Sequence, residues 1–125
     1  MMSFILRLLL LLQPHLTSNV YDVETTPLQI YQDYKANKDK ADTRYLNKKI
    51  LIKGKVDQVS ANLWTIYFAI PDPNGLTACI DDTDHELLNV PIYKHGDIAT
   101  LVCIGSGLVF NLPILLHCRL PEDMK

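Results

Sequence analysis

Little in this sequence of 125 residues points to catalysis. It contains no Walker-type phosphate loop, no nucleophile beside a base and no recognisable pair of catalytic carboxylates. The segment Gly105-Ser106-Gly107 lacks the residue that separates Gly from Ser in the G-x-S-x-G elbow, and we interpret it as a loop. We therefore expect a protein that is not an enzyme.

Metal-binding patterns are equally scarce. His15, His85, His95 and His117 are scattered, and no two of them have the four-residue spacing of a helical zinc site. The acidic run 81–86 lacks the glycine and the distant Glu of a calcium loop, so helix capping and solvation are the favoured interpretation. We predict no metal and no cofactor, and a metal hydrolase is the least favoured function.

The apolar run near the N-terminus is too short to cross a bilayer, which takes about 20 apolar residues. Arg7 followed by Leu8 to Leu12 resembles a secretory signal, although no A-x-A cleavage site follows. Residues 1–20 are predicted to be a signal peptide or a disordered tail, and residues 21–125 a single domain. The predicted location is periplasmic or secreted, with the cytoplasm as the alternative.

The overall charge is low and slightly acidic, at -2 with a pI near 6.0, which argues against a dedicated nucleic-acid binder. The distribution is uneven. Residues 33–55 carry eight Lys or Arg against three Asp, whereas residues 56–125 carry three basic and nine acidic side chains. We expect two solvated faces of opposite sign.

Helical signals come first along the chain. Thr25-Thr26-Pro27 is a typical helix start. An apolar stripe of Leu28, Tyr31 and either Ile30 or Tyr34 predicts a helix to about residue 36. A second helical segment is expected at about 38–45.

Strand signals follow from Lys49, where the apolar period changes to two. Gly54 is a place where the first strand can bend, and the second strand is expected to turn Trp64, Ile66, Phe68 and Ile70 inward. A short helix or loop is expected at 82–90. The predicted strands are 49–59, 63–70, 76–81, 97–104 and 114–120. Five short strands favour a small closed barrel, and an open α+β sheet is the alternative.

Two stretches of the sequence resemble a known family. The first contains Tyr34-Lys-Ala-Asn37, Ala41-Asp42, Tyr45, Lys48-Lys49, Ile52, Gly54 and Val56. The second contains Lys94-His95-Gly96-Asp97, Ala99, Leu101 and Cys103-Ile104-Gly105, with Cys118 as a late cysteine. Together they are similar to the tRNA-anticodon-like OB-fold family of small, often exported proteins. The resemblance implies an all-β, five-stranded OB-fold barrel with an N-terminal helix packed outside it.

The resemblance also decides between the cysteine pairings. The spacing of Cys103 and Cys118 permits a disulfide between the fourth and fifth strands, but the alternation along the fourth strand leaves its inward face open. The family likeness favours this disulfide, and Cys79 would stay unpaired. A disulfide would in turn support an oxidising compartment.

OB barrels bind on the outer face of their second and third strands and with adjoining loops. The predicted ligand-binding residues on this face are Lys53, Lys55, Thr65, Tyr67 and Thr77. Tyr67 is the one aromatic residue among these five, so the face offers little surface on which bases could stack. We therefore predict a non-enzymatic binding module for a protein or small envelope ligand, with an inhibitory or immunity-type role. The alternative is a binder of single-stranded DNA, RNA or tRNA.

Overall fold

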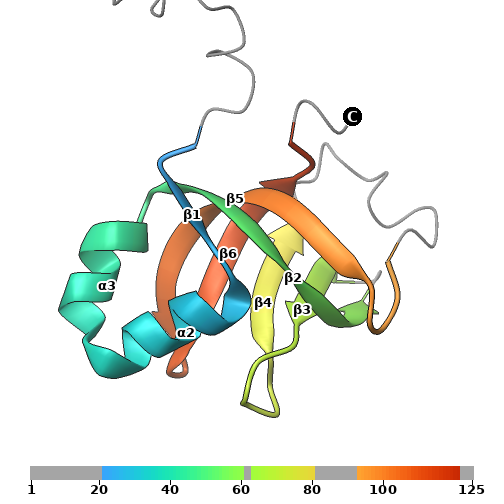
Figure 1. The fold of residues 1–125 in the computed structure, drawn as a ribbon, viewed down its shortest axis with the longest axis horizontal. Coiled ribbons are helices and arrows are strands. Elements are labelled where there is room, and N and C mark those ends of the chain that lie inside the picture. The colour runs from blue at the N-terminus through green and yellow to red at the C-terminus, as the bar shows by residue number, and fades with distance from the viewer. Residues whose placement is uncertain (1–20, 61–62, 81–92, 122–125) are drawn as a thin grey trace, which may run out of the picture.

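The computed structural model describes residues 21–60, 63–80 and 93–121, with the backbone alone described at 79 and 80 (Figure 1). The predicted signal peptide, the acidic run 81–86 and the predicted helix or loop at 82–90 lie outside the described residues. The elements are β1 (Val23–Thr25), α2 (Pro27–Ala36), α3 (Lys38–Tyr45), β2 (Lys49–Ser60), β3 (Thr65–Phe68), β4 (Leu76–Ile80), β5 (Ile98–Val109) and β6 (Leu112–Arg119).

Strands β2 to β6 close into a barrel. The long strand β2 pairs antiparallel with β3 through its second half and with β5 through its first half. The circuit is completed by antiparallel β3–β4, parallel β4–β6 and antiparallel β5–β6 pairing. The five-stranded OB-fold barrel is therefore confirmed and the open sheet is excluded. The short strand β1, which the sequence did not predict, pairs parallel with the start of β2.

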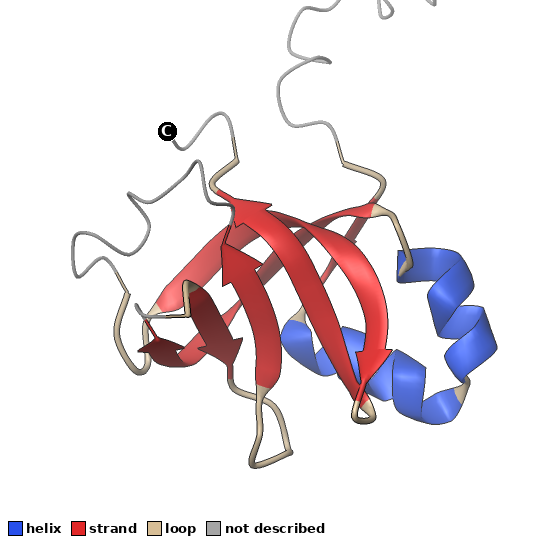
Figure 2. Ribbon diagram, turned by 180° about the vertical axis from the view of Figure 1, so that it is seen from behind, coloured by secondary structure: helices blue, strands red, loops and turns tan. Residues whose placement is uncertain are grey.

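The helices lie together on one side of the barrel (Figure 2). The Thr26 hydroxyl accepts a hydrogen bond from the Gln29 N–H (3.1 Å) and caps α2, as the sequence predicted. The buried side of α2 carries Pro27, Ile30, Tyr31 and Tyr34, whereas Leu28 is 44% exposed. The inclusion of Leu28 in the apolar stripe was wrong, because the stripe runs through Pro27 and Ile30 instead.

Strand boundaries agree with the predicted ones to within two residues, except at the end of β5. This strand continues through Gly105, Ser106 and Gly107 to Val109, so the interpretation of that segment as a loop was wrong. The physical reason is the close approach of α3 to the strand. A Cβ at Gly105 would overlap the carbonyl oxygen of Tyr45, and the Asn47 N–H donates to the Gly105 carbonyl (2.9 Å). Glycine here permits contact between helix and strand.

The inward face of β6 also differs from a regular alternation. Leu115 and Cys118 are fully buried, whereas Ile114 and Leu116 are half-buried. The prediction that Ile114 and Leu116 face inward with Cys118 was wrong. His117 adopts a left-handed φ of 54°, and the β5–β6 register shifts beside it. An irregularity of this kind in a strand changes which residues face the core.

The core is apolar and joins the barrel to α2 and α3. Gly54 lies at this junction, because a Cβ there would overlap the ring of Pro27 at the start of α2. Gly54, which the sequence suggested as a place for a bend, allows the helix to approach β2. Ile66 and Phe68 are fully buried as predicted, and Trp64 and Ile70 are half-buried against the core. The buried apolar cluster is Ile30, Tyr34, Ala41, Tyr45, Ile50, Ile52, Val56, Ile66, Phe68, Leu76, Ala78, Ala99, Leu101, Cys103, Leu115 and Cys118.

Candidate functional site

Of the five predicted ligand-binding residues, Tyr67 and Thr77 lie on one outer face of β3 and β4. Tyr67 lies directly opposite Thr77, and the row continues to Gln58 on β2 and to Ile114 on β6. Cross-strand partners share one face of a sheet, so these four side chains form a continuous strip on the outside of the barrel. Gln58 is exposed and the other three are half-buried. The strip contains no charged residue.

Thr65 does not belong to that exposed strip. It shares the outward parity of Tyr67, but only 3% of its surface is accessible. Its hydroxyl donates to the carbonyl of Leu63 (2.8 Å), which keeps the side chain within the turn between β2 and β3. The expectation that Thr65 is accessible on the outer face was wrong, because strand parity does not account for the turn.

Lys53 and Lys55 are exposed but lie beside a different strand. Their cross-strand partners are Thr100 and Ile98 on β5. The first half of β2 pairs with β5, and only its second half pairs with β3. The structure therefore brings Tyr67 and Thr77 together and places the two lysines beside β5.

The turn between β5 and β6 is a feature that the sequence reasoning missed. Phe110 and Asn111 are its two central residues, both with positive φ (51° and 66°), and the flanking Val109 and Leu112 are paired. Phe110 is 95% exposed, the highest exposure among the large hydrophobic residues that the structure describes. Asn111 within an apolar run was the available signal for a two-residue turn.

A hollow of about 230 Å³ lies beside this turn. It is bounded by α2, by the β5–β6 hairpin and by the turn between β3 and β4, and Figures 1 and 2 both show these three segments at one end of the barrel. Tyr31 Oη donates to the Pro71 carbonyl across it (3.4 Å). The hollow is lined by Tyr31, Tyr34, Lys35, Asp72, Leu108, Asn111 and Pro113.

A second hollow of about 410 Å³ lies between α2 and α3. Asp33 on its wall is already engaged, since its carboxylate accepts from Tyr45, Gln29 and Arg44. The lining residues are Asp33, Ala36, Asn37, Lys40, Ala41, Thr43 and Arg44. We regard this space as a consequence of the way the two helices are joined.

Two crossed Tyr–Asp hydrogen bonds join these helices. Tyr34 of α2 donates to Asp42 Oδ1 of α3 (2.7 Å), and Tyr45 of α3 donates to Asp33 Oδ2 of α2 (2.6 Å). The two tyrosine rings stack with centroids 6.0 Å apart. We call these four residues the Tyr–Asp clasp. Asn37, between the helices, caps α3 by accepting from the Lys40 N–H (3.1 Å).

The surroundings of the clasp shift the pKa values of Tyr34, Tyr45 and Asp42. Burial, followed by the hydrogen bond to Asp42, raises the pKa of Tyr34. Burial and the hydrogen bond to Asp33 likewise raise the pKa of Tyr45. The pKa of Asp42 is lowered, first by its contact with Lys38 Nζ (2.6 Å) and then by the Tyr34 hydroxyl. Tyr34 and Tyr45 are therefore neutral phenols that donate their hydrogen bonds, and the Asp42 carboxylate that accepts from Tyr34 is ionised.

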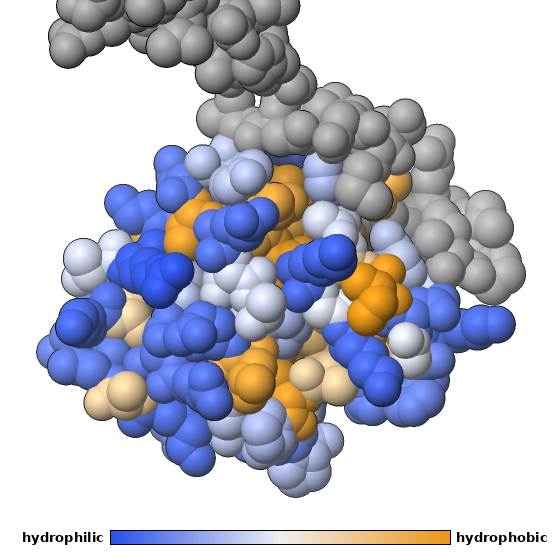
Figure 3. Space-filling model, in the orientation of Figure 1, coloured by the Kyte–Doolittle hydropathy of each residue, from blue (hydrophilic) through white to orange (hydrophobic). Residues whose placement is uncertain are grey.

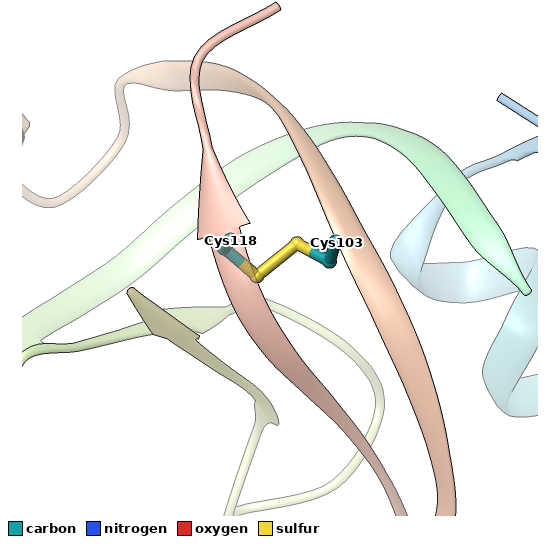
Figure 4. The surroundings of a disulfide bond; sticks show 2 residues. All are labelled: Cys103 and Cys118. Atoms are coloured by element: carbon teal, nitrogen blue, oxygen red, sulfur yellow. A yellow bond between two sulfur atoms is a disulfide. The ribbon is translucent and has the colours of Figure 1, made fainter. Parts of the chain in front are cut away.

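The predicted disulfide between Cys103 on β5 and Cys118 on β6 is confirmed (Figure 4). Both residues are fully buried and their Cα atoms are 4.1 Å apart. The prediction that Cys79 stays unpaired concerns a side chain outside the described part of the chain.

Across residues 21–60, 63–80 and 93–121 there is no cluster of three or more His, Cys, Asp or Glu residues placed to hold a metal. None of the helices in that part of the chain is long and apolar enough to span a membrane.

Fold and site define a small OB-fold barrel with an attached helix pair and an uncharged outer strip. The model of the tRNA_anti-like family matches residues 15–120, and the chain belongs to this family. No curated protein and no solved structure is significantly similar to the chain. The motif residues Tyr34, Asn37, Asp42 and Tyr45 that first indicated the family form helix caps and the Tyr–Asp clasp.

The second motif is likewise structural. Lys94 and Asp97 close a turn through reciprocal bonds of 3.0 Å, and Gly96 adopts a φ of 92° between them. The Gly96 N–H donates to the Val56 carbonyl (2.8 Å), which fixes the turn against β2. The family motif residues therefore support the fold, and none of the four residues of the outer strip belongs to the motif.

Proposed function

We propose that the chain is a non-enzymatic OB-fold binding module whose ligand is a protein or a small envelope molecule. The observation that carries the proposal is the uncharged outer strip of Gln58, Tyr67, Thr77 and Ile114. The strip lies on the part of the barrel that OB folds commonly use for ligands. It offers one aromatic ring, two polar side chains and one aliphatic side chain, which suits contact with a protein surface. An inhibitory or immunity-type role agrees with such a contact.

Binding of single-stranded nucleic acid remains the second candidate, supported by the family likeness and the basic stretch at 33–55. Such binding usually combines several stacked bases with a positively charged groove. Tyr67 is the one ring on the strip, and Lys53 and Lys55 lie beside β5. Elsewhere in the basic stretch, Lys38 and Arg44 pair with Asp42 and Asp33. On the face shown in Figure 3, hydrophilic side chains predominate on the side where the helices lie, and several separate apolar patches are exposed elsewhere on that face.

We further propose that the protein is exported to the periplasm or secreted, with the cytoplasm as the alternative. The Cys103–Cys118 disulfide supports this location, because cytosolic thiols are normally kept reduced. The test is the count of free thiols in protein isolated from its native host under non-reducing conditions. One free thiol is expected, and three would contradict the proposal.

The binding proposal is tested by photo-crosslinking in native-host extracts. A photoreactive phenylalanine analogue replaces Tyr67 in one sample and the exposed helix residue Gln32 in the control. A protease-sensitive adduct from position 67, absent from position 32, is expected. A nuclease-sensitive adduct from position 67 would favour the second candidate.

An independent measurement separates the same two candidates. The affinity for a single-stranded oligonucleotide is followed as salt concentration rises. If nucleic acid is the ligand, binding weakens steeply with salt and is lost in the double variant Lys53→Ala and Tyr67→Ala, because phosphate contacts release counterions. We expect no such binding from the wild-type protein.

A further inference from the structure

The turn between β5 and β6 displays an aromatic ring that contributes little to the fold. Phe110 is 95% exposed and Val109 beside it is 45% exposed. The six residues 108–113, Leu-Val-Phe-Asn-Leu-Pro, contain no charge. A single exposed apolar residue is common on protein surfaces, but a nearly fully exposed phenylalanine at a turn tip is not explained by burial.

The backbone at Phe110 is unfavourable for its side chain. A two-residue hairpin turn with positive φ at both central positions favours Asn, Asp or Gly at the first of them. Phe110 occupies that position with φ 51°, where a bulky side chain is strained. The fold alone would favour Asn at this position, so Phe110 is placed there at a cost to stability. Strained residues of this kind are concentrated at functional positions.

The backbone of the turn is supported by paired and buried residues below it. Val109 pairs with Leu112 and Leu108 pairs with Pro113 below the tip. Pro113 is fully buried, and Leu108 packs against the core. The backbone of the tip therefore needs little ordering when it is bound, which favours its use as an anchor.

We propose that Phe110, flanked by Val109, is an anchor that enters an apolar pocket on a protein partner. The proposal rests on the proposed function, and Phe110 lies at the turn that leads into β6, the strand that carries Ile114 of the outer strip. Aromatic residues are enriched among the anchors of protein interfaces. The hollow beside the turn, with Lys35 and Asp72 on its walls, would receive polar groups from the rim of that pocket.

A protein fits this tip better than a lipid surface or a nucleic acid. Attraction to anionic lipid relies on clustered basic residues, and the tip residues carry none. Lys35, the basic residue in the adjoining hollow, lies 5.3 Å from the centroid of the Tyr31 ring. A single ring without surrounding cations supplies one stacking position and no backbone groove for nucleic acid.

The experiment places a photoreactive phenylalanine analogue at position 110 and compares unlabelled competitors in native-host extracts. The wild-type chain and Leu63→Asn should compete equally, since Leu63 is another exposed apolar turn residue, at 66%. Phe110→Asn should compete at least about tenfold less well. The same variant should unfold at an equal or slightly higher temperature, because Asn suits the turn, and lost binding would then not reflect lost folding.

The outcomes are separable. A protein adduct at position 110 that Phe110→Asn fails to displace supports the anchor. No adduct there, equal competition by Phe110→Asn, or an adduct to lipid or nucleic acid overturns it. A protein adduct that still forms from position 67 in a chain that itself carries Phe110→Asn would overturn the anchor and leave the binding proposal standing. The absence of any protein adduct at position 67, with a competed adduct at position 110, would reject the outer strip alone.

Discussion

Two glycines permit close approaches between the helices and the barrel. Gly54 accommodates the ring of Pro27, and Gly105 accommodates the backbone carbonyl of Tyr45. In each case a Cβ would occupy space that another group already fills. The two contacts differ in their partner, because a proline ring can shift slightly with its helix, whereas the Tyr45 carbonyl is backbone just before the Leu46–Gly105 bridge.

Replacing Gly54 with alanine is expected to lower the free energy of unfolding by about 1–3 kcal/mol, because the start of α2 must move away from β2. Urea denaturation measures the change. Pro27→Ala serves as the matched background, since it removes the ring that the new methyl group would overlap. In that background Gly54→Ala should cost less than about 1 kcal/mol. An equal cost in both backgrounds would show that the Pro27 contact is not the cause.

Single residues also mark where sequence reasoning succeeds. Strand alternation placed Tyr67 outward and Phe68 inward correctly, because both lie within the regular part of β3. The same alternation failed at Thr65 and at Ile114, which lie near a turn and near the His117 irregularity. The alternation of inward and outward residues along a strand does not reveal where the backbone φ angle departs from its extended value. Phe110 escaped notice because its exposure depends on a turn that disfavours its own residue type.

At the level of elements, the Tyr–Asp clasp joins two short helices of 10 and 8 residues. Isolated helices of this length are marginal in water. Each helix supplies one tyrosine and one aspartate, so neither clasp bond forms unless both helices are present. Tyr45 connects further to β1, where its hydroxyl lies 3.2 Å from Thr25 Oγ1.

Tyr45→Phe is expected to lower the free energy of unfolding by about 1–2 kcal/mol, because it removes the bond to Asp33 and deprives the buried Thr25 hydroxyl of a partner. Chemical denaturation gives the value. Tyr31→Phe is the control, since the contact of the Tyr31 hydroxyl with Pro71 is long at 3.4 Å. The control should change stability by no more than about 0.5 kcal/mol. Equal losses would argue against a special role for the clasp.

Asp42 gives the helix pair a pH dependence. Its pKa is lowered in the folded state by Lys38 and Tyr34, so the unfolded chain takes up the proton more readily. The contribution of Asp42 is therefore complete above the unfolded carboxyl pKa of about 3.9 and is lost as pH falls through the lower folded value. Urea midpoints measured from neutral to acidic pH should decline less steeply for Asp42→Asn, with Tyr34→Phe intermediate. Parallel curves would contradict this assignment.

Both helices were predictable because their signals are local. Thr26, Pro27 and Asn37 act within one helical turn, and the observed helices cover the predicted segments. The extension of β5 to Val109 was not predictable in the same way. It depends on Gly105 contacting Tyr45, which lies 60 residues earlier and is brought there by the folded barrel. Likewise β1 is a three-residue strand that exists through its pairing with β2.

At the scale of the whole molecule, the disulfide ties β5 to β6 where the barrel closes. Ile50 pairs with Cys103, and Ile80 on β4 pairs with Cys118. The disulfide therefore joins β5, which pairs with β2, to β6, which pairs with β4. The closed barrel itself was predictable from five short strands, whereas the choice of the cysteine pair depended on the family likeness.

Loss of the disulfide is expected to lower the free energy of unfolding by about 3 kcal/mol, because the bond closes a loop of 15 residues in the unfolded chain. The double variant Cys103→Ala and Cys118→Ala, compared with wild type in urea, measures this. Reductant should destabilise the wild type and leave the double variant unchanged. Cys79→Ser is the control and should respond to reductant as the wild type does. A wild-type protein that is insensitive to reductant would contradict the prediction.

The described chain enters and leaves the barrel at the pole opposite the β5–β6 turn (Figure 1). Val23 lies beside Ile50, and Arg119 lies across from Val102. From Val102 to Val109 β5 advances seven residues, about 23 Å at the usual rise of a strand. A linkage made beyond either end of the described chain therefore starts from one pole of the barrel, while Phe110 occupies the other. The protein can therefore be immobilised through either end of the described chain while Phe110 stays accessible.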